Sequence, residues 1–165
     1  RRRHTRYISV TGVQTCALPI LTNLKRMVKI TLRIINNSDI GFLYKLLKER
    51  QTKTFISHGK IPTYAEHTRF VKSKPYSKWY IIMVGTRKVG TIYLTKQNEI
   101  GIFVKKWIQH QGIGTHALEI LMENNPGLRY LANVSPKNKD SMEFFQKNGF
   151  KLIQYTYQLI DSEYT

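Results

Sequence analysis

Cysteine is almost absent from this 165-residue chain, which contains only Cys16. A single cysteine cannot form a disulfide within the chain or supply the paired thiolates of a cysteine-based metal site. Scarce cysteine fits a reducing compartment, so we expect a cytoplasmic protein. Long apolar runs are also missing, since none approaches the roughly twenty residues that span a bilayer. We therefore expect neither a membrane-spanning segment nor a bound metal.

Acidic residues are also few. Ten Asp and Glu stand against 27 Lys and Arg, and the net charge is +17. A basic excess of this size raises nucleic-acid binding as one hypothesis. The basic residues are scattered, however, and no basic-aromatic repeat or helix-turn-helix pattern accompanies them. The pattern thus disfavours a nucleic-acid partner without excluding one.

The first twenty residues lack the periodicity and helix caps of folded protein. They hold four arginines and no acidic residue, as a disordered basic arm or a targeting peptide would. Residues 10–20 and 1–6 also resemble the translation of a common sequencing-library adapter. We interpret residues 1–26 as an artefactual or disordered leader, with Met27 as the expected start. Residues 27–165 then form a single domain without cysteine, whose charge is 21 basic minus 10 acidic residues, or +11.

A glycine turn between a strand and a helix is the most informative stretch. Residues 99–104 are apolar and rich in β-formers, which predicts a buried strand, and apolar spacing predicts a helix from about residue 112 to 124. Between them lies Gln109-x-x-Gly112-x-Gly114. Backbone N–H groups at such a helix start, together with the helix dipole, favour binding of an anion such as a pyrophosphate. A tight connection without a ligand is the alternative.

Two motifs resemble those of the GNAT N-acetyltransferase superfamily. The glycine turn and its preceding strand are similar to motif A, (Gln/Arg)-x-x-Gly-x-(Gly/Ala). Asn138-x-x-Ser-Met-x-Phe-Phe145-x-x-x-Gly149-Phe150 is similar to the family signature Asn-x-x-Ala-x-x-x-Tyr-x-x-x-Gly-Phe. The resemblance covers about residues 30–159. It implies an acetyl-CoA-dependent enzyme that acetylates a primary amine by direct attack, without a covalent enzyme intermediate.

The pattern of elements agrees with this resemblance. Strands are expected at 30–35, 79–84, 89–94, 99–104 and 129–134, with one or two closing strands at 151–159. Besides the central helix, helices are expected at 40–50, at 64–71 after a Thr63/Glu66 capping box, and at 139–147. The resemblance implies an α/β (α+β) fold. Its mixed, mostly antiparallel sheet would have six to seven strands, with helices on both faces.

The resemblance also assigns the residues that would hold acetyl-CoA. The amides of Gln111, Gly112, Ile113, Gly114 and Thr115 would bind the pyrophosphate, and Gln109 would orient the loop. Phe103 and Val104 end the strand along which the pantetheine arm would lie, and the N–H near Val104 would polarise the acetyl carbonyl. Asn138 matches a cofactor-contacting asparagine, although it is equally well explained as a plain N-cap.

Catalysis is less completely specified. Glu99 is the expected general base, since alternation places it on the same side as Gly101 and Phe103. Glu-Ile-Gly here resembles the branch that acts on ribosomal-protein N-termini and nucleotide-linked amino sugars. Phe145 stands where many members have the tyrosine that protonates the departing thiolate, and phenylalanine cannot donate a proton. Tyr93, Tyr130 and Tyr155 are unranked substitutes.

The acceptor is not specified by the sequence. Residues 52–71 hold the candidates His58, Tyr64 and His67, with Tyr76 nearby, and the acceptor is expected to be a small-molecule amine or a peptide N-terminus. A homodimer is compatible with the pattern. A catalytically silent acyl-CoA-binding regulator is the main alternative, because of Phe145, and a basic nucleic-acid-binding domain is the weaker one.

Overall fold

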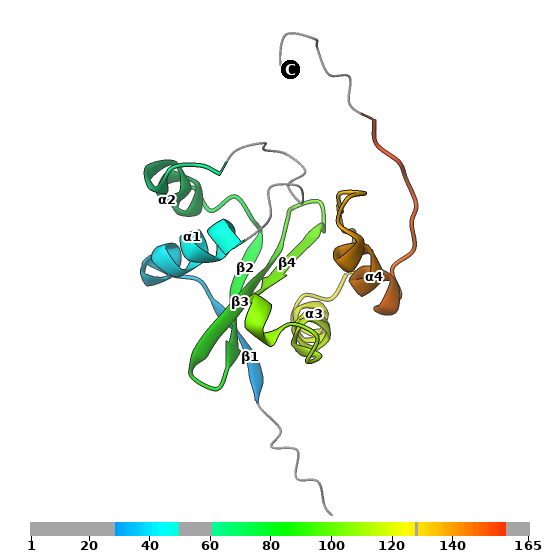
Figure 1. Ribbon diagram of the computed structural model, residues 1–165, viewed down its shortest axis with the longest axis horizontal. Coiled ribbons are helices and arrows are strands. Elements are labelled where there is room, and N and C mark those ends of the chain that lie inside the picture. The colour runs from blue at the N-terminus through cyan, green and yellow to red at the C-terminus, as the bar shows by residue number, and fades with distance from the viewer. Residues whose placement is uncertain (1–28, 50–60, 128, 158–165) are drawn as a thin grey trace, which may run out of the picture.

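The computed structural model of the protein describes residues 29–49, 61–127 and 129–157. In chain order its strands are β1 (Ile30–Ile34), β2 (Lys78–Val84), β3 (Arg87–Leu94) and β4 (Ile100–Val104). Its helices are α1 (Ile40–Glu49), α2 (Tyr64–Lys72), α3 (Ile113–Asn124) and α4 (Lys139–Lys147). Two 3-10 turns, η1 (Asn37–Asp39) and η3 (Lys106–Ile108), precede α1 and α3 (Figure 1). Every helix predicted from the sequence is therefore present.

Within the described residues, the sheet consists of four antiparallel strands in the order β1-β2-β3-β4. Helices α1 and α2 lie on one side of it, and α3 and α4 on the other (Figure 1). Each side has its own core. Ile81 of β2 packs with Leu43 and Val71 on the α1/α2 side. Ile92 of β3 packs with Leu118 and Phe145 on the α3/α4 side.

The expectation of six to seven strands is wrong for the part of the chain that the structure describes. The segment predicted as a strand at 129–134 makes only one parallel bridge, between Glu99 and Leu131. Its apolar side chains Tyr130, Ala132 and Val134 still pack against the core. Their alternation thus reflects one buried face rather than a hydrogen-bonded ladder. Residues 151–157 form no strand and are exposed; residues 158–159 lie outside the described part.

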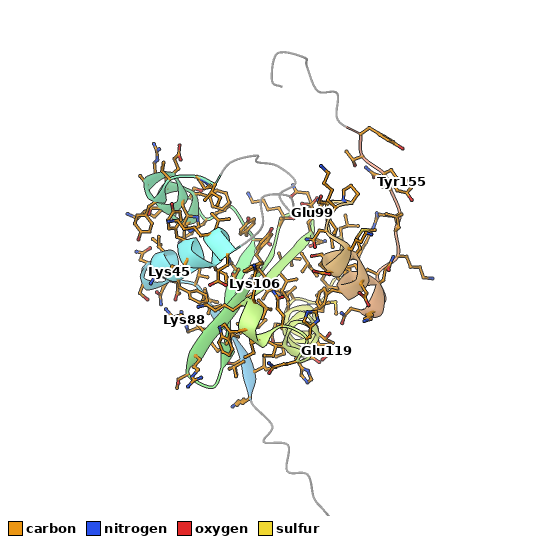
Figure 2. The ribbon with its side chains drawn as sticks, viewed as in Figure 1. Lys45, Lys88, Glu99, Lys106, Glu119 and Tyr155 are labelled. Carbon is orange, nitrogen blue, oxygen red and sulfur yellow. The ribbon has the colours of Figure 1, made fainter. Side chains whose placement is uncertain are left out.

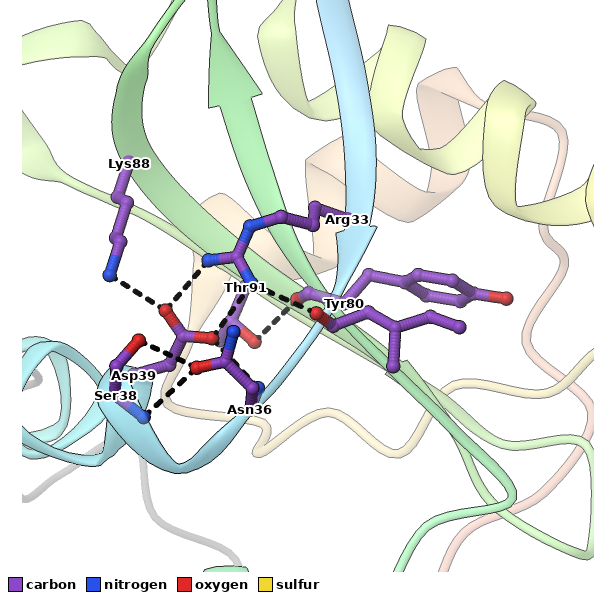
Figure 3. Close-up of polar contacts among 8 residues, drawn as sticks. Arg33, Asn36, Ser38, Asp39, Tyr80, Lys88 and Thr91 are labelled. Atoms are coloured by element: carbon purple, nitrogen blue, oxygen red, sulfur yellow. Dashed lines mark hydrogen bonds and ion pairs between the residues drawn. The ribbon is translucent and has the colours of Figure 1, made fainter.

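An ion cluster around a buried carboxylate joins β1, β3 and η1 (Figure 3). The Asp39 carboxylate is completely buried and accepts two hydrogen bonds from the Arg33 guanidinium, at 3.0 and 2.7 Å. Lys88 Nζ lies 2.7 Å from the same carboxylate, and the Asn36 N–H donates to it at 2.8 Å. Burial by itself raises the pKa of Asp39, but the bonds from Arg33, Lys88 and Asn36 outweigh it and lower the pKa to about 2.

Candidate functional site

The start of α3 presents a row of unpaired amides. Gly112 is its N-cap, with φ of +78°, and no side chain caps the helix. The first helical bond runs from the His116 N–H to the Gly112 carbonyl, at 3.1 Å. The amides of Ile113, Gly114 and Thr115 precede that bond, and among the described residues none of them has an acceptor. With the helix dipole, they form a site suited to an anion.

The loop before α3 is held in a defined shape. Gln109 Nε2 donates to the Val104 carbonyl at 2.7 Å and so ties the loop to the end of β4. His110 and Gly112 both have left-handed backbone conformations, with φ of +61° and +78°. A Cβ at Gly112 would meet nothing within 4 Å, so the protein leaves open space on that side of the turn.

Gly114 is constrained by α4 rather than by the turn. A Cβ at this position would lie 3.0 Å from the Phe144 ring and 3.8 Å from Ile102. The absence of a side chain therefore lets the start of α3 approach α4 closely. The sequence motif singled out Gly114 as a cofactor-binding residue, but it gave no signal that Phe144 is the neighbour that requires a glycine.

Strand β4 has one edge that is largely unpaired. Bonds from the Thr95 N–H to the Glu99 carbonyl and from the Lys105 N–H to the Val89 carbonyl set the phase of its pairing with β3. In an antiparallel ladder the intervening residues alternate, so Gly101 and Phe103 bond towards β3 and Ile102 and Val104 point away. Ile100 uses the second edge to donate to Leu131, at 2.8 Å. Beyond it, the N–H groups of Ile102 and Val104 have no partner within the described ranges.

Each carboxylate oxygen of Glu99 has a neighbouring hydrogen-bond donor. Asn133 Nδ2 donates to Glu99 Oε1 at 2.8 Å, and the Thr95 hydroxyl lies 3.4 Å from Glu99 Oε2. Figure 2 places Glu99 at the start of β4, at the opposite end of the strand from Lys106. Asn133 and Thr95 were not identified from the sequence. The apolar segment at 129–134 was the available signal, because its single parallel bridge from Leu131 to Glu99 brings Asn133, two residues further on, within reach of the carboxylate.

The remaining candidates lie in different surroundings. Asn138 is the N-cap of α4 and accepts a bond from the Ser141 N–H at 3.2 Å, as a plain cap does. Phe145 is 8% exposed and packs against Phe144 and Phe150, with ring centroids 5.1 Å away in each case. His67 is buried beside Tyr44, and this burial lowers the pKa of its imidazole. His58 lies outside the described residues.

No metal site or membrane span is found in the described segments. They contain no group of three His, Cys, Asp or Glu side chains arranged to hold an ion. None of their helices combines the length and apolar character needed to cross a bilayer.

Comparison with known proteins identifies a family. The model of the acetyltransferase (GNAT) family matches residues 42–150. No curated protein matches the sequence. Solved structures that share the fold include a domain from Methanocaldococcus jannaschii, with 23% identity and a TM-score of 0.69 over 78% of this chain and 92% of that one.

Two further structures share the fold at lower identity. RimL, a ribosomal L7/L12 α-N-protein acetyltransferase in complex with coenzyme A, has 19% identity and a TM-score of 0.61 over 77% of this chain and 84% of that one. A chimera of spermidine N-acetyltransferase SpeG from Vibrio cholerae and hSSAT has 13% identity and a TM-score of 0.58, over 72% and 78% of the two chains. At these identities the likeness concerns the fold.

Proposed function

Since this chain belongs to the acetyltransferase (GNAT) family, we propose that it transfers an acetyl group from acetyl-CoA to the primary amine of a small molecule or a peptide N-terminus. The observation that carries this proposal is the row of unpaired amides at Ile113, Gly114 and Thr115, which follows the open edge of β4 in the chain. The unpaired amides suit the pyrophosphate of coenzyme A, and the open edge of β4 suits its amide-containing arm. Scarce cysteine supports the cytoplasm as the proposed compartment.

The residues at the start of α3 fit a diphosphate. The amides of Gln111 to Thr115 would donate to its oxygens, and Gly112 leaves room for a close approach of the backbone. Gln109 has a supporting role, because its side chain is already bonded to the Val104 carbonyl. Asn138 would contact the cofactor only with groups that its capping bond to Ser141 does not use.

The open edge of β4 fits an extended chain with amide groups. Such a chain would bond to Ile102 and Val104 much as an added strand does. The Val104 N–H would also be placed to stabilise negative charge on the acetyl oxygen during attack. Phe103 has its backbone turned towards β3, so any contribution from it would come from its side chain.

Glu99 is the proposed general base. Ammonium groups are not nucleophiles, and an alkylamine with a pKa near 10 is only about one part in a thousand neutral at pH 7. Glu99, directly or through one water, would take the proton as the C–N bond forms. Its bonds to Asn133 and Thr95 would hold the carboxylate in one orientation, which reduces the cost of positioning it.

Calorimetry with acetyl-CoA, followed by a thiol-release assay, tests this proposal. The amines would be spermidine, a peptide with an N-terminal serine, and a nucleotide-linked amino sugar. We expect saturable binding, and thiol release with at least one amine. Binding without release from any amine would favour a catalytically silent acyl-CoA sensor instead. No binding would contradict both readings and favour the nucleic-acid alternative.

A further inference from the structure

The reaction requires a proton for the departing thiolate, and α4 does not supply it. Phe145 has no acidic hydrogen and is enclosed by Phe144 and Phe150. The thiolate would then either leave unprotonated toward solvent or take its proton from another group near the middle of β4, where the thioester would lie under the proposed function. The tyrosines that the sequence offers as substitutes are Tyr93, Tyr130 and Tyr155.

Two of these tyrosines are poorly placed. The Tyr130 hydroxyl donates to the Asn125 carbonyl at 2.6 Å, so its proton is engaged at the far end of α3. Tyr155 is 75% exposed, and Figure 2 shows it on the segment that follows α4 rather than on the sheet.

Tyr93 lies directly on β4. It pairs with Gly101 across the β3-β4 ladder. A Cβ added at Gly101 would overlap both the ring carbon Cζ and the hydroxyl oxygen of Tyr93. The hydroxyl therefore rests over the backbone of β4, one residue, or roughly 3.4 Å along the strand, from Ile102. Among the described residues it has no hydrogen-bond partner.

Neighbouring aromatic rings hold Tyr93 in this position. Its ring stacks on Tyr76, with centroids 3.8 Å apart and planes 6° from parallel. The Trp79 ring meets it edge-on at 6.4 Å. Glu99 and Gly101 belong to the same face of β4 by alternation. A fixed phenol and a fixed carboxylate thus lie on one face of the strand whose edge is open.

We propose that Tyr93 is the general acid of this acetyl transfer, in place of a donor on α4; this rests on the proposed function. The amine nitrogen bonds to the acetyl carbon, and the carbonyl electron pair moves to oxygen. The C–S bond then breaks, its electron pair goes to sulfur, and the Tyr93 proton follows it to give the thiol of coenzyme A. The tyrosinate regains a proton from solvent, while Glu99 has accepted the proton of the amine.

Tyr93→Phe is the direct test, because it retains the ring and the stack on Tyr76 and removes only the hydroxyl. Thiol release would be measured with the best amine of the panel. General acids typically contribute about 10²- to 10⁴-fold, so we expect kcat to fall at least about tenfold, with the KM for acetyl-CoA within about twofold of wild type. Tyr155→Phe is the matched control and should retain full activity. Unchanged kcat in Tyr93→Phe, or an equal loss in both variants, would overturn the proposal.

A second measurement needs no acceptor. Coenzyme A and desulfo-coenzyme A differ only at the sulfur, which the Tyr93 hydroxyl would contact. By calorimetry, the wild type should prefer coenzyme A by about two- to tenfold, the contribution of one hydrogen bond. Tyr93→Phe should bind both equally. A preference that survives in Tyr93→Phe would refute the contact at sulfur while leaving the proposed function intact, whereas a wild type that binds neither compound would refute the proposed function itself.

Gly101→Ala gives an independent variant that keeps the hydroxyl but displaces it. The new methyl group would push the Tyr93 ring off β4. We expect the preference for coenzyme A over desulfo-coenzyme A to disappear in this variant as well, provided that circular dichroism confirms the fold. Retention of the wild-type preference would show that the position of the ring over Gly101 does not matter, and would count against Tyr93.

Discussion

Replacement of Asp39 by asparagine should markedly destabilise the protein. The carboxylate is fully buried and balances two cations, Arg33 and Lys88, while it also accepts from the Asn36 N–H (Figure 3). An amide is isosteric, but it carries no charge and turns an NH₂ group towards donors. Arg33 and Lys88 are each about one-third exposed, so water can partly replace the lost partner. The loss should therefore fall short of that for a completely buried pair.

The size of the effect follows from the pKa of Asp39. It falls from 3.8 to about 2, because bonds from Arg33, Lys88 and Asn36 outweigh the opposing effect of burial. At about 1.36 kcal/mol per unit, this shift corresponds to roughly 2 kcal/mol of folding free energy. Since the folded pKa is the lower one, this contribution is fully present above about pH 4. It is lost as the pH falls through about 2.

Urea denaturation of wild type and Asp39→Asn, at pH 7 and at pH 2 to 3, measures this contribution. We expect Asp39→Asn to be less stable by roughly 2 to 4 kcal/mol at pH 7. The difference should narrow towards pH 2, as the wild-type carboxylate is protonated. Asp140→Asn, an exposed Asp of α4, is the matched control and should change stability little at either pH. A difference that is absent at pH 7, or is the same at both pH values, would refute the reasoning.

Three further predictions concern activity and the chain start. Gly112→Asp should abolish acetyl-CoA binding in calorimetry through charge repulsion at the pyrophosphate; a Cβ there meets nothing within 4 Å, but the φ of +78° strains any side chain, so circular dichroism has to show a native fold, and retained affinity would then contradict the site. Glu99→Gln should lower kcat at least about tenfold at pH 7, with acetyl-CoA affinity little changed and a deficit that shrinks towards pH 9; equal rates from pH 7 to 9 would exclude it as the base. Deletion of residues 1–26 should leave the melting temperature and activity unchanged, and a large drop in either would show that these residues contribute to the fold.

Local signals in the sequence predicted the helices well. The Thr63/Glu66 capping box is present, with the Thr63 N–H donating to Glu66 Oε2 at 2.7 Å. Gly149 follows α4 with φ of +84°, as expected for a glycine after a helix end. Such signals depend on residues within one turn of each other. The pairing of strands depends instead on residues far apart in the sequence. This is why a full strand was expected at 129–134, where the structure has a single bridge.

For the candidate site, the sequence predicted only features of the local backbone. The turn at Gly112 was identified because neighbouring residues in the sequence determine its backbone conformation. The bond from Asn133 to Glu99 and the contact of Tyr93 with Gly101 depend on how strands align across the sheet. Strand pairing fixes these contacts, and the sequence alone leaves it open. The burial of Asp39 was missed for the same reason, since Asn36–Asp39 was interpreted only as a helix start.

Strand β4 should show an unusual pattern of amide hydrogen exchange. Gly101 and Phe103 have their N–H groups within the β3-β4 ladder, whereas those of Ile102 and Val104 point to an edge without a described partner. Exchange rates should therefore alternate from one residue to the next along a single strand. Any molecule that bonds along this edge would slow the fast amides and leave the slow ones unchanged. Two amides in the middle of the protein would thus report occupancy of β4 directly, without a label and without knowledge of the acceptor.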